Sequence, residues 1–215
     1  AYDVVLLAAP LAAMPEVLAE VAARRPRGRV VEIASIKSHL RPALERLREA
    51  GTPAISLHPM FGPGKNPYEP LTVVHAVLGD EAEERELVTR LLAHPYLDLV
   101  SLPFERHDRL MGWLLGLAHL TGMLFADALA RSGLHPAELA RVASTTFKRQ
   151  AATAASVLGE DPDLYFAIQR LNPHRGEVYA AITAAVGELT GAVERDDREA
   201  FREALGRAAG ALPSA

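Results

Sequence analysis

The periodicity of the sequence changes once, near residue 103, and this change limits the folds open to the chain. Between residues 3 and 102, short apolar runs rich in β-branched residues alternate with segments whose apolar residues recur at helical spacing. From residue 104 onward only helical spacing is found. We therefore expect an α/β part, residues 1–102, followed by an all-α part, residues 103–215.

Five strands are expected in the α/β part, at residues 3–9, 29–34, 54–57, 72–78 and 96–102. The first of them, DVVLLAA, is continuously apolar, which is typical of a parallel strand covered on both faces. Helices are expected at residues 11–25, 38–50 and 81–93. Ser38 is a suitable N-cap for the second helix, and Gly51 stops it. The expected sheet is therefore parallel.

The all-α part is expected to contain a long helix around residues 110–128, followed by helices at residues 136–158, 163–171, 174–194 and 198–210. Gly112, Gly116 and Gly122 would destabilise the long helix unless another helix packs closely against it. Because the apolar faces exceed what one small bundle can bury, we expect this part to form a dimer.

Composition narrows the class of protein. The chain has 215 residues, 49% hydrophobic and 23% charged, as in soluble globular proteins. No apolar run approaches the roughly 20 residues of a membrane span, and no signal peptide is visible. The net charge of −4 argues against nucleic-acid and membrane partners. The absence of cysteine excludes disulfides and thiolate metal sites, and we expect a cytoplasmic protein without a metal centre.

His58 is the first candidate functional residue. It follows the expected strand at residues 54–57 and precedes a Gly/Pro/Asn-rich stretch, residues 62–70. Ligands of open α/β sheets bind beyond the carboxyl ends of the strands, and histidine exchanges protons near neutral pH. A loop histidine that is hydrogen-bonded to the backbone fits the same position equally well.

Several segments, in order along the chain, form a recognisable set of motifs. The α/β part contributes VVLLAAP, EIASIK and LHPMFGP, at residues 4–10, 32–37 and 57–63. The all-α part contributes the pair His107-Asp108 and the segments LAHLTGMLFADAL, STTFKRQ, GEDPDLYFAIQRLN and ERDDREAFREAL. The combination of HPMFGP with DPxLYxxI is specific, whereas either motif alone is weak. With these segments the chain resembles the prephenate dehydrogenase family, which includes arogenate-using members.

The resemblance implies a partial Rossmann-type half that binds NAD or NADP, followed by a helical dimerisation half. It implies oxidation of prephenate or arogenate with loss of CO2. His58 would then accept a hydrogen bond or proton from the substrate hydroxyl, and Ser35 would orient the substrate. The nicotinamide side would be lined by Ala9, Pro10 and Ser35.

The resemblance also implies a set of side chains that contact the carboxylates of the substrate: Lys37, His119, Lys148 and Arg149. Other readings of these residue types stay open. Lysines are most often solvated surface charges, and a histidine among leucines is as often a core residue as a ligand contact. A serine such as Ser35 also suits the end of a turn.

The glycine-rich motif G-x-G-x-x-G occurs nowhere in the 215 residues. The chain resembles the family from about the fourth strand of the Rossmann half, so NAD or NADP binding is in question. It is expected to be a fragment of a longer dehydrogenase, one half of a two-chain enzyme, or a shortened relative. A shortened relative would use the pocket of His58 and Ser35 for a non-redox isomerase, lyase or hydrolase reaction, or act as a dimerisation or binding module.

Overall fold

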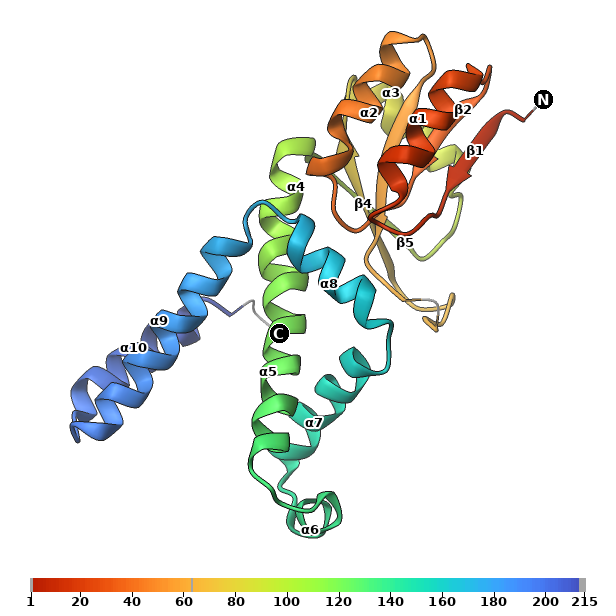
Figure 1. Cartoon of the computed structure of the whole chain (residues 1–215). Helices are drawn as coiled ribbons and strands as arrows, with labels where there is room; N and C mark the ends of the chain where they lie inside the picture. The colour runs from red at the N-terminus through yellow and green to blue at the C-terminus, as the bar shows by residue number, and fades with distance from the viewer. Residues whose placement is uncertain (1, 63, 213–215) are drawn as a thin grey trace. The chain divides into compact units, whose positions relative to one another are not determined.

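The computed structural model describes residues 2–62 and 64–212 (Figure 1). Its contacts divide the chain into two compact units, residues 1–173 and residues 174–215. The first unit contains the sheet, the helices around it and the helices as far as Leu171. The second contains the last two helices.

The first unit is built on a five-stranded sheet whose strands lie in sequence order. The strands are β1 (Val4–Leu7), β2 (Arg29–Glu32), β3 (Ala54–Pro59), β4 (Leu71–Val77) and β5 (Leu97–Pro103). β1, β2 and β3 are parallel, as are β4 and β5, which confirms the predicted α/β class. The prediction of a wholly parallel sheet is wrong at one pair, because β4 runs antiparallel to β3. A parallel pairing needs a crossover connection, usually a helix, and the described residues 60–62 and 64–70 form none.

The two faces of the sheet are covered by different helices. On one face, α1 (Met14–Arg24) and α2 (Arg41–Glu49) share a core with Val30 and Ala54. On the other face, α3 (Glu81–Leu91) packs over Val31, Ile55 and Leu57. Since side chains alternate along a strand, the polar residues between these apolar positions point toward the α1–α2 face.

The prediction that Ser38 caps the second helix is wrong. Ser38 does not cap α2 with its side chain, because it lies inside a short 3₁₀ helix, η1 (Ser38–Leu40), that leads into α2. Its backbone N–H instead donates to the Asp108 carboxylate, 2.6 Å away. The loop after β2 is therefore tied to a residue far along the chain.

β5 leads directly into one long continuous helix made of three segments: α4 (Phe104–Met111), the π-helical η2 (Gly112–Leu117) and α5 (Ala118–Arg131). α5 packs against α7 (Thr145–Leu158). A Cβ on Gly122 would lie 3.4 Å from Cγ2 of Val157 in α7. The predicted close helix contact is therefore confirmed at Gly122.

The single helix expected at residues 136–158 is wrong. The structure has α6 (Pro136–Val142) and α7, separated by Ala143 and Ser144 in extended conformation. The hydroxyl of Ser144 accepts a hydrogen bond from the backbone N of Phe147 at 3.1 Å. The helix breaks here because Ser144 caps a new one. α8 (Pro162–Leu171) completes the first unit.

The second unit consists of α9 (Arg175–Glu194) and α10 (Arg198–Gly210), at the bounds expected for them. Arg207 pairs with Glu188 across the two helices, and Ala192 and Ala204 are buried between them. The predicted domain boundary near Pro103 stays a prediction. The division into compact units falls after Pro173, because η2 contacts α4, α5 and α8, α5 contacts α7, and α4 contacts β4 and β5.

The continuous helix Phe104–Arg131 differs from one sequence expectation. It has 28 residues, and its most apolar window has a mean hydropathy of 1.4 with only 11% of it buried. By length and composition alone it could cross a membrane, although no such segment was expected. A helix left uncovered in one chain is equally suited to packing against a second protein chain.

Candidate active site

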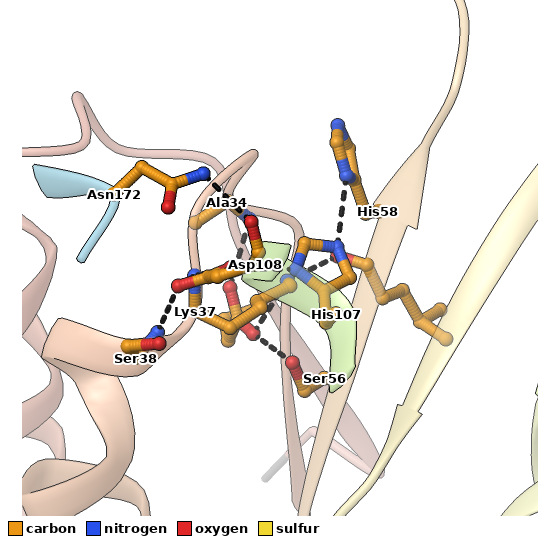
Figure 2. A network of polar contacts seen from close by, with 10 residues as sticks. Ala34, Lys37, Ser38, Ser56, His58, His107, Asp108 and Asn172 are labelled. Carbon is orange, nitrogen blue, oxygen red and sulfur yellow. Dashed lines mark hydrogen bonds and ion pairs between the residues drawn. The ribbon is translucent and has the colours of Figure 1, made fainter. Parts of the chain in front are cut away.

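His58 lies in β3 near its carboxyl end and contacts a second histidine, His107, in α4. Nδ1 of His58 is 3.0 Å from Nε2 of His107 (Figure 2). Nδ1 of His107 is in turn 2.7 Å from Oδ1 of Asp108. All three side chains are buried, with His58 4% exposed. The three residues form a hydrogen-bonded relay that ends at His58.

Asp108, the inner end of the relay, is held by the loop after β2. Its carboxylate accepts hydrogen bonds from the backbone N of Lys37, at 2.9 and 3.1 Å, and from that of Ser38. Its backbone carbonyl accepts one from Nδ2 of Asn172 at 2.7 Å. Burial alone would raise the pKa of Asp108, but the hydrogen bonds from His107, Ser38 and Lys37 outweigh it and lower the pKa. Asp108 is therefore an ionised acceptor.

The ionised Asp108 fixes the protonation of both imidazoles. A carboxylate only accepts, so Nδ1 of His107 carries the proton and donates. Nε2 of neutral His107 is then an acceptor, so Nδ1 of His58 must carry the proton that joins the two rings. This leaves Nε2 of His58 unprotonated, and the hydrogen bond found for this ring among the described residues is made by Nδ1. The relay therefore presents Nε2 of His58 as a free acceptor.

The pKa values of both histidines favour the neutral forms. Burial, followed by the nearby charge of Lys37 and by His107, lowers the pKa of His58 to about 2. Burial also lowers the pKa of His107, although Asp108 opposes that shift. His58 thus stays an uncharged acceptor throughout the neutral and mildly acidic range.

Lys37 lies elsewhere than the sequence implied. Its side chain is fully buried, and Nζ donates to Oε1 of Glu32 at 2.7 Å and to the carbonyl of Leu57 at 2.6 Å. Glu32, in β2, also accepts hydrogen bonds from the Ser56 hydroxyl and from the backbone N of Ala34. The expectation that Lys37 offers its charge to a substrate carboxylate is therefore corrected, because an internal carboxylate takes that charge.

The expected cofactor-side residues gather at the same edge of the sheet as His58. Ala9 and Pro10 follow β1, and Ser35 follows β2. Since β1, β2 and β3 are parallel, their carboxyl ends share one edge. Ala9 and Ser35 are half-buried and Pro10 is exposed. The topology therefore brings these three positions and His58 to one edge.

His119, Lys148 and Arg149 lie on the helices. His119, on α5, is half-buried, and its ring meets that of Tyr165 edge-on at a centroid distance of 4.6 Å. Its buried Nδ1 has no hydrogen-bond partner among the described residues, and burial lowers its pKa. Lys148 and Arg149, in α7, are exposed. Within the described part of the chain, no hydrogen bond or ion pair links these three residues to the relay.

Sequence reasoning missed the partners of His58 and of Lys37. His107 and Asp108 were noted only as a matching pair, and Glu32 only as a part of EIASIK. The signal available was the acidic residue inside an otherwise apolar strand, because a buried carboxylate needs a partner. Among residues 2–62 and 64–212, no cluster of three His, Cys, Asp or Glu side chains is arranged to hold a metal ion.

Comparison with known proteins agrees with this fold. The profile of the prephenate dehydrogenase nucleotide-binding domain matches residues 1–73, and that of the prephenate dehydrogenase dimerization domain matches residues 103–207. A 4-amino-4-deoxyprephenate dehydrogenase of Streptomyces pristinaespiralis is 32% identical over 99% of this chain and 71% of the relative. The chain belongs to the prephenate dehydrogenase family.

Further relatives fix the extent of the similarity. A probable arogenate/prephenate dehydrogenase of Methanocaldococcus jannaschii is 28% identical over 96% of this chain, which spans 47% of that relative. The crystal structure of Aquifex aeolicus prephenate dehydrogenase with hydroxyphenyl propionate and NAD+ superposes with a TM-score of 0.74 at 20% identity, over 96% of this chain and 74% of that one. Synechocystis arogenate dehydrogenase gives 0.71 at 15% identity, over 97% and 77%. These structures support the fold.

Proposed function

We propose that the chain acts in the oxidative decarboxylation of a cyclohexadienyl substrate, prephenate or arogenate, with NAD or NADP as hydride acceptor. The observation that carries the proposal is the protonation pattern of the relay, which leaves Nε2 of His58 as a neutral acceptor at the carboxyl edge of the sheet. The family membership and the match to a nucleotide-binding domain profile support the choice of reaction.

The proposed role of His58 follows from the charges that develop in the reaction. The bound nicotinamide would supply the acceptor for the hydride from the carbon that carries the hydroxyl. As hydride leaves, positive charge develops on the hydroxyl oxygen, and an acceptor at Nε2 of His58 stabilises it. The bond to the departing carboxylate breaks with its electron pair entering the ring, so CO2 and an aromatic product form. The relay keeps the acceptor neutral and oriented.

The substrate contacts are the finer part of the proposal. Ser35, half-buried beside the same edge, would orient the hydroxyl, and Ala9 and Pro10 would line the nicotinamide side. Lys148 and Arg149 are exposed and so able to meet a carboxylate, and Arg149 offers the planar fork that suits one. Lys37 is no longer in this set, since its ammonium is engaged with Glu32.

The relative from Streptomyces pristinaespiralis adds a third substrate class. Its name describes a prephenate in which an amino group stands at the position of the hydroxyl. A neutral amine also donates a hydrogen bond, so Nε2 of His58 suits either group. Prephenate, arogenate and the 4-amino analogue are therefore the substrates to compare.

We further propose that the chain works as a homodimer through its helical part. The match of residues 103–207 to a dimerization domain profile supports this, as does the uncovered apolar helix Phe104–Arg131. Sedimentation at several concentrations tests it, and a monomer at all of them would contradict it.

The test of function combines binding and turnover. Calorimetry with NAD and with NADP, each with and without the three substrates, shows whether this chain binds a nicotinamide cofactor. Formation of the reduced cofactor and of CO2 is then followed for the chain, for His58→Asn and for the exposed control His94→Asn. We expect turnover to fall at least about 100-fold in His58→Asn, with little change in substrate affinity, and to stay unchanged in the control.

Two results would count against the proposal. Unchanged turnover in His58→Asn would remove His58 from the mechanism. Binding of a cyclohexadienyl carboxylate without binding of either nucleotide would favour the cofactor-free alternative, in which the site of His58 and Ser35 serves a non-redox reaction. Ligand binding that is insensitive to His58→Asn and depends on Lys148 would favour a non-catalytic binding module.

A further inference from the structure

The ion pair Lys37–Glu32 adjoins the relay and is inaccessible to solvent. Both side chains are 0% exposed, and their charged atoms are 2.7 Å apart. A buried ion pair contributes little net stability, because the loss of hydration offsets the attraction between the charges. Net stability therefore does not explain why this ion pair is buried next to the strand that carries His58.

Lys37 holds both ends of the relay. Its ammonium donates to the carbonyl of Leu57, the residue that precedes His58 in β3. Its backbone N–H donates to the carboxylate of Asp108, which orients His107 (Figure 2). A single residue thus fixes the strand that carries His58 and the acid that sets the protonation of the relay.

Glu32 holds Lys37 in this position from the neighbouring strand. Its Oε1 accepts from Nζ of Lys37 and from the hydroxyl of Ser56, which lies directly opposite Glu32 in the pairing of β2 with β3. Its Oε2 accepts from the backbone N of Ala34 at 2.8 Å. With both carboxylate oxygens engaged, Glu32 has a fixed orientation, so the ammonium of Lys37 has one as well.

We infer that Lys37 and Glu32 are positioning residues, which hold His58 as a neutral acceptor with its proton on Nδ1 and do not bind the substrate. This inference rests on the proposed function for its catalytic meaning. The charged and titratable groups near His58 are Lys37 before η1, Glu32 in β2, and His107 and Asp108 in α4. The opposite residue in β4, Val74, is apolar. Lys37 is the cation in this set, and its charge disfavours protonation of His58.

The test measures the imidazoles directly and needs no turnover. Two-bond proton–nitrogen-15 spectra of histidine-labelled protein report which ring nitrogen carries the proton, and a pH series reports the pKa of each ring. The proteins are the unaltered chain, Lys37→Met and the charge-neutral double variant Lys37→Met/Glu32→Gln. Arg24→Met is the control, because Arg24 forms an exposed ion pair with Glu20. His58→Asn assigns the resonance.

In the unaltered chain and in the control, we expect His58 to carry its proton on Nδ1 and to remain neutral to the lowest pH at which the chain is folded. In both Lys37 variants we expect the pKa of His58 to rise by about one to three units, as for the loss of a neighbouring like charge. The backbone N of residue 37 still donates to Asp108 in these variants, but β3 loses the bond from Nζ to the carbonyl of Leu57, so we expect the His58 ring to be less well oriented and to show a mixture of the two neutral forms. An unchanged pKa and an unchanged proton position in a folded variant would overturn the inference.

A second measurement separates positioning from substrate binding. If the chain has the proposed activity, Lys37→Met should lower kcat at least about 10-fold with KM changed less than about threefold. A raised KM with unchanged kcat would assign Lys37 to the substrate instead. If the chain shows no dehydrogenase activity, the proposed function fails and the spectra still decide this inference. Loss of folding in both Lys37 variants would overturn it, because the pair would then serve the fold alone.

Discussion

The buried His58 makes the stability of the chain depend on pH in a way that can be calculated. Burial, with the charge of Lys37, lowers its pKa to about 2 in the folded chain. In the unfolded chain an imidazole has its ordinary pKa of about 6.5. Between these two values the unfolded chain binds the proton and the folded chain does not. The stability due to neutral His58 is therefore fully present above about pH 6.5 and is lost as the pH falls.

The expected size of this loss follows from the two pKa values. At pH 5, protonation of one ordinary imidazole stabilises the unfolded chain by RT ln(1 + 10^1.5), about 2 kcal/mol, whereas at pH 7 the same expression gives about 0.2 kcal/mol. Because pH 5 lies well above the pKa of folded His58, the folded chain takes up almost no proton at this site. Acidification from pH 7 to pH 5 should thus cost about 2 kcal/mol through His58.

The measurement is urea unfolding at both pH values for the unaltered chain and for His58→Asn. The side-chain amide of asparagine can still donate to Nε2 of His107, but it does not titrate. The fluorescence of Trp113, the only tryptophan in the sequence, reports on the first unit. All other residues are the same in both proteins, so their contributions cancel in the difference.

We expect the unaltered chain to lose about 2 kcal/mol more than His58→Asn between pH 7 and pH 5. The exposed His94→Asn should behave like the unaltered chain. Equal losses in the unaltered chain and His58→Asn, within about 0.5 kcal/mol, would refute the argument that His58 is held neutral by burial.

Three further outcomes are expected. Asp108→Asn should reverse the direction of the hydrogen bonds in the relay, because the new amide donates to Nδ1 of His107 and thereby places the proton on Nε2 of His58. Turnover of the proposed reaction should then fall about 10²- to 10⁴-fold, as in other enzymes whose relay acid is replaced by an amide, and imidazole spectra should show the moved proton. Gly122→Leu should destabilise the first unit by about 1–3 kcal/mol in urea unfolding, since α7 leaves no room, whereas Gly122→Ala should change it by less than about 1 kcal/mol. Ser144→Ala should cost about 1 kcal/mol in the same assay through loss of the α7 cap, and a loss below about 0.3 kcal/mol would contradict that role.

Much of the fold could be predicted because periodicity and apolar runs are local signals. The strands and α10 lie within about two residues of their expected bounds, and the change to all-helical structure follows β5. The direction of β4 could not be predicted in this way, since strand orientation depends on the connection and not on the strand itself. The break at Ala143 was missed because neither Gly nor Pro marks it; the cap at Ser144 was its only local signal.

The candidate site was likewise predictable only where the signal is local in the sequence. His58 could be identified because its motif lies where a strand ends, and the family resemblance gave it a role. His107, 49 residues further along, could not be joined to it without the path of α4. Lys37 was misassigned because burial cannot be read from residue type, and most lysines are solvated. Its true surroundings depend on Glu32 and Leu57, which only the sheet brings together.

The antiparallel pairing of β4 with β3 has a consequence for how relatives of this protein can diverge. The loop that follows Pro59 connects β3 to β4, and the two strands pair next to this loop, where Pro59 lies opposite Val73. The ladder itself, and not a crossover helix, sets the register of the two strands. Insertions in this loop cost little, because doubling its length adds only about 0.6 kcal/mol of closure entropy. The loop can therefore be lengthened or rebuilt in relatives without displacing His58, so the substrate preference of the proposed reaction can change through this loop.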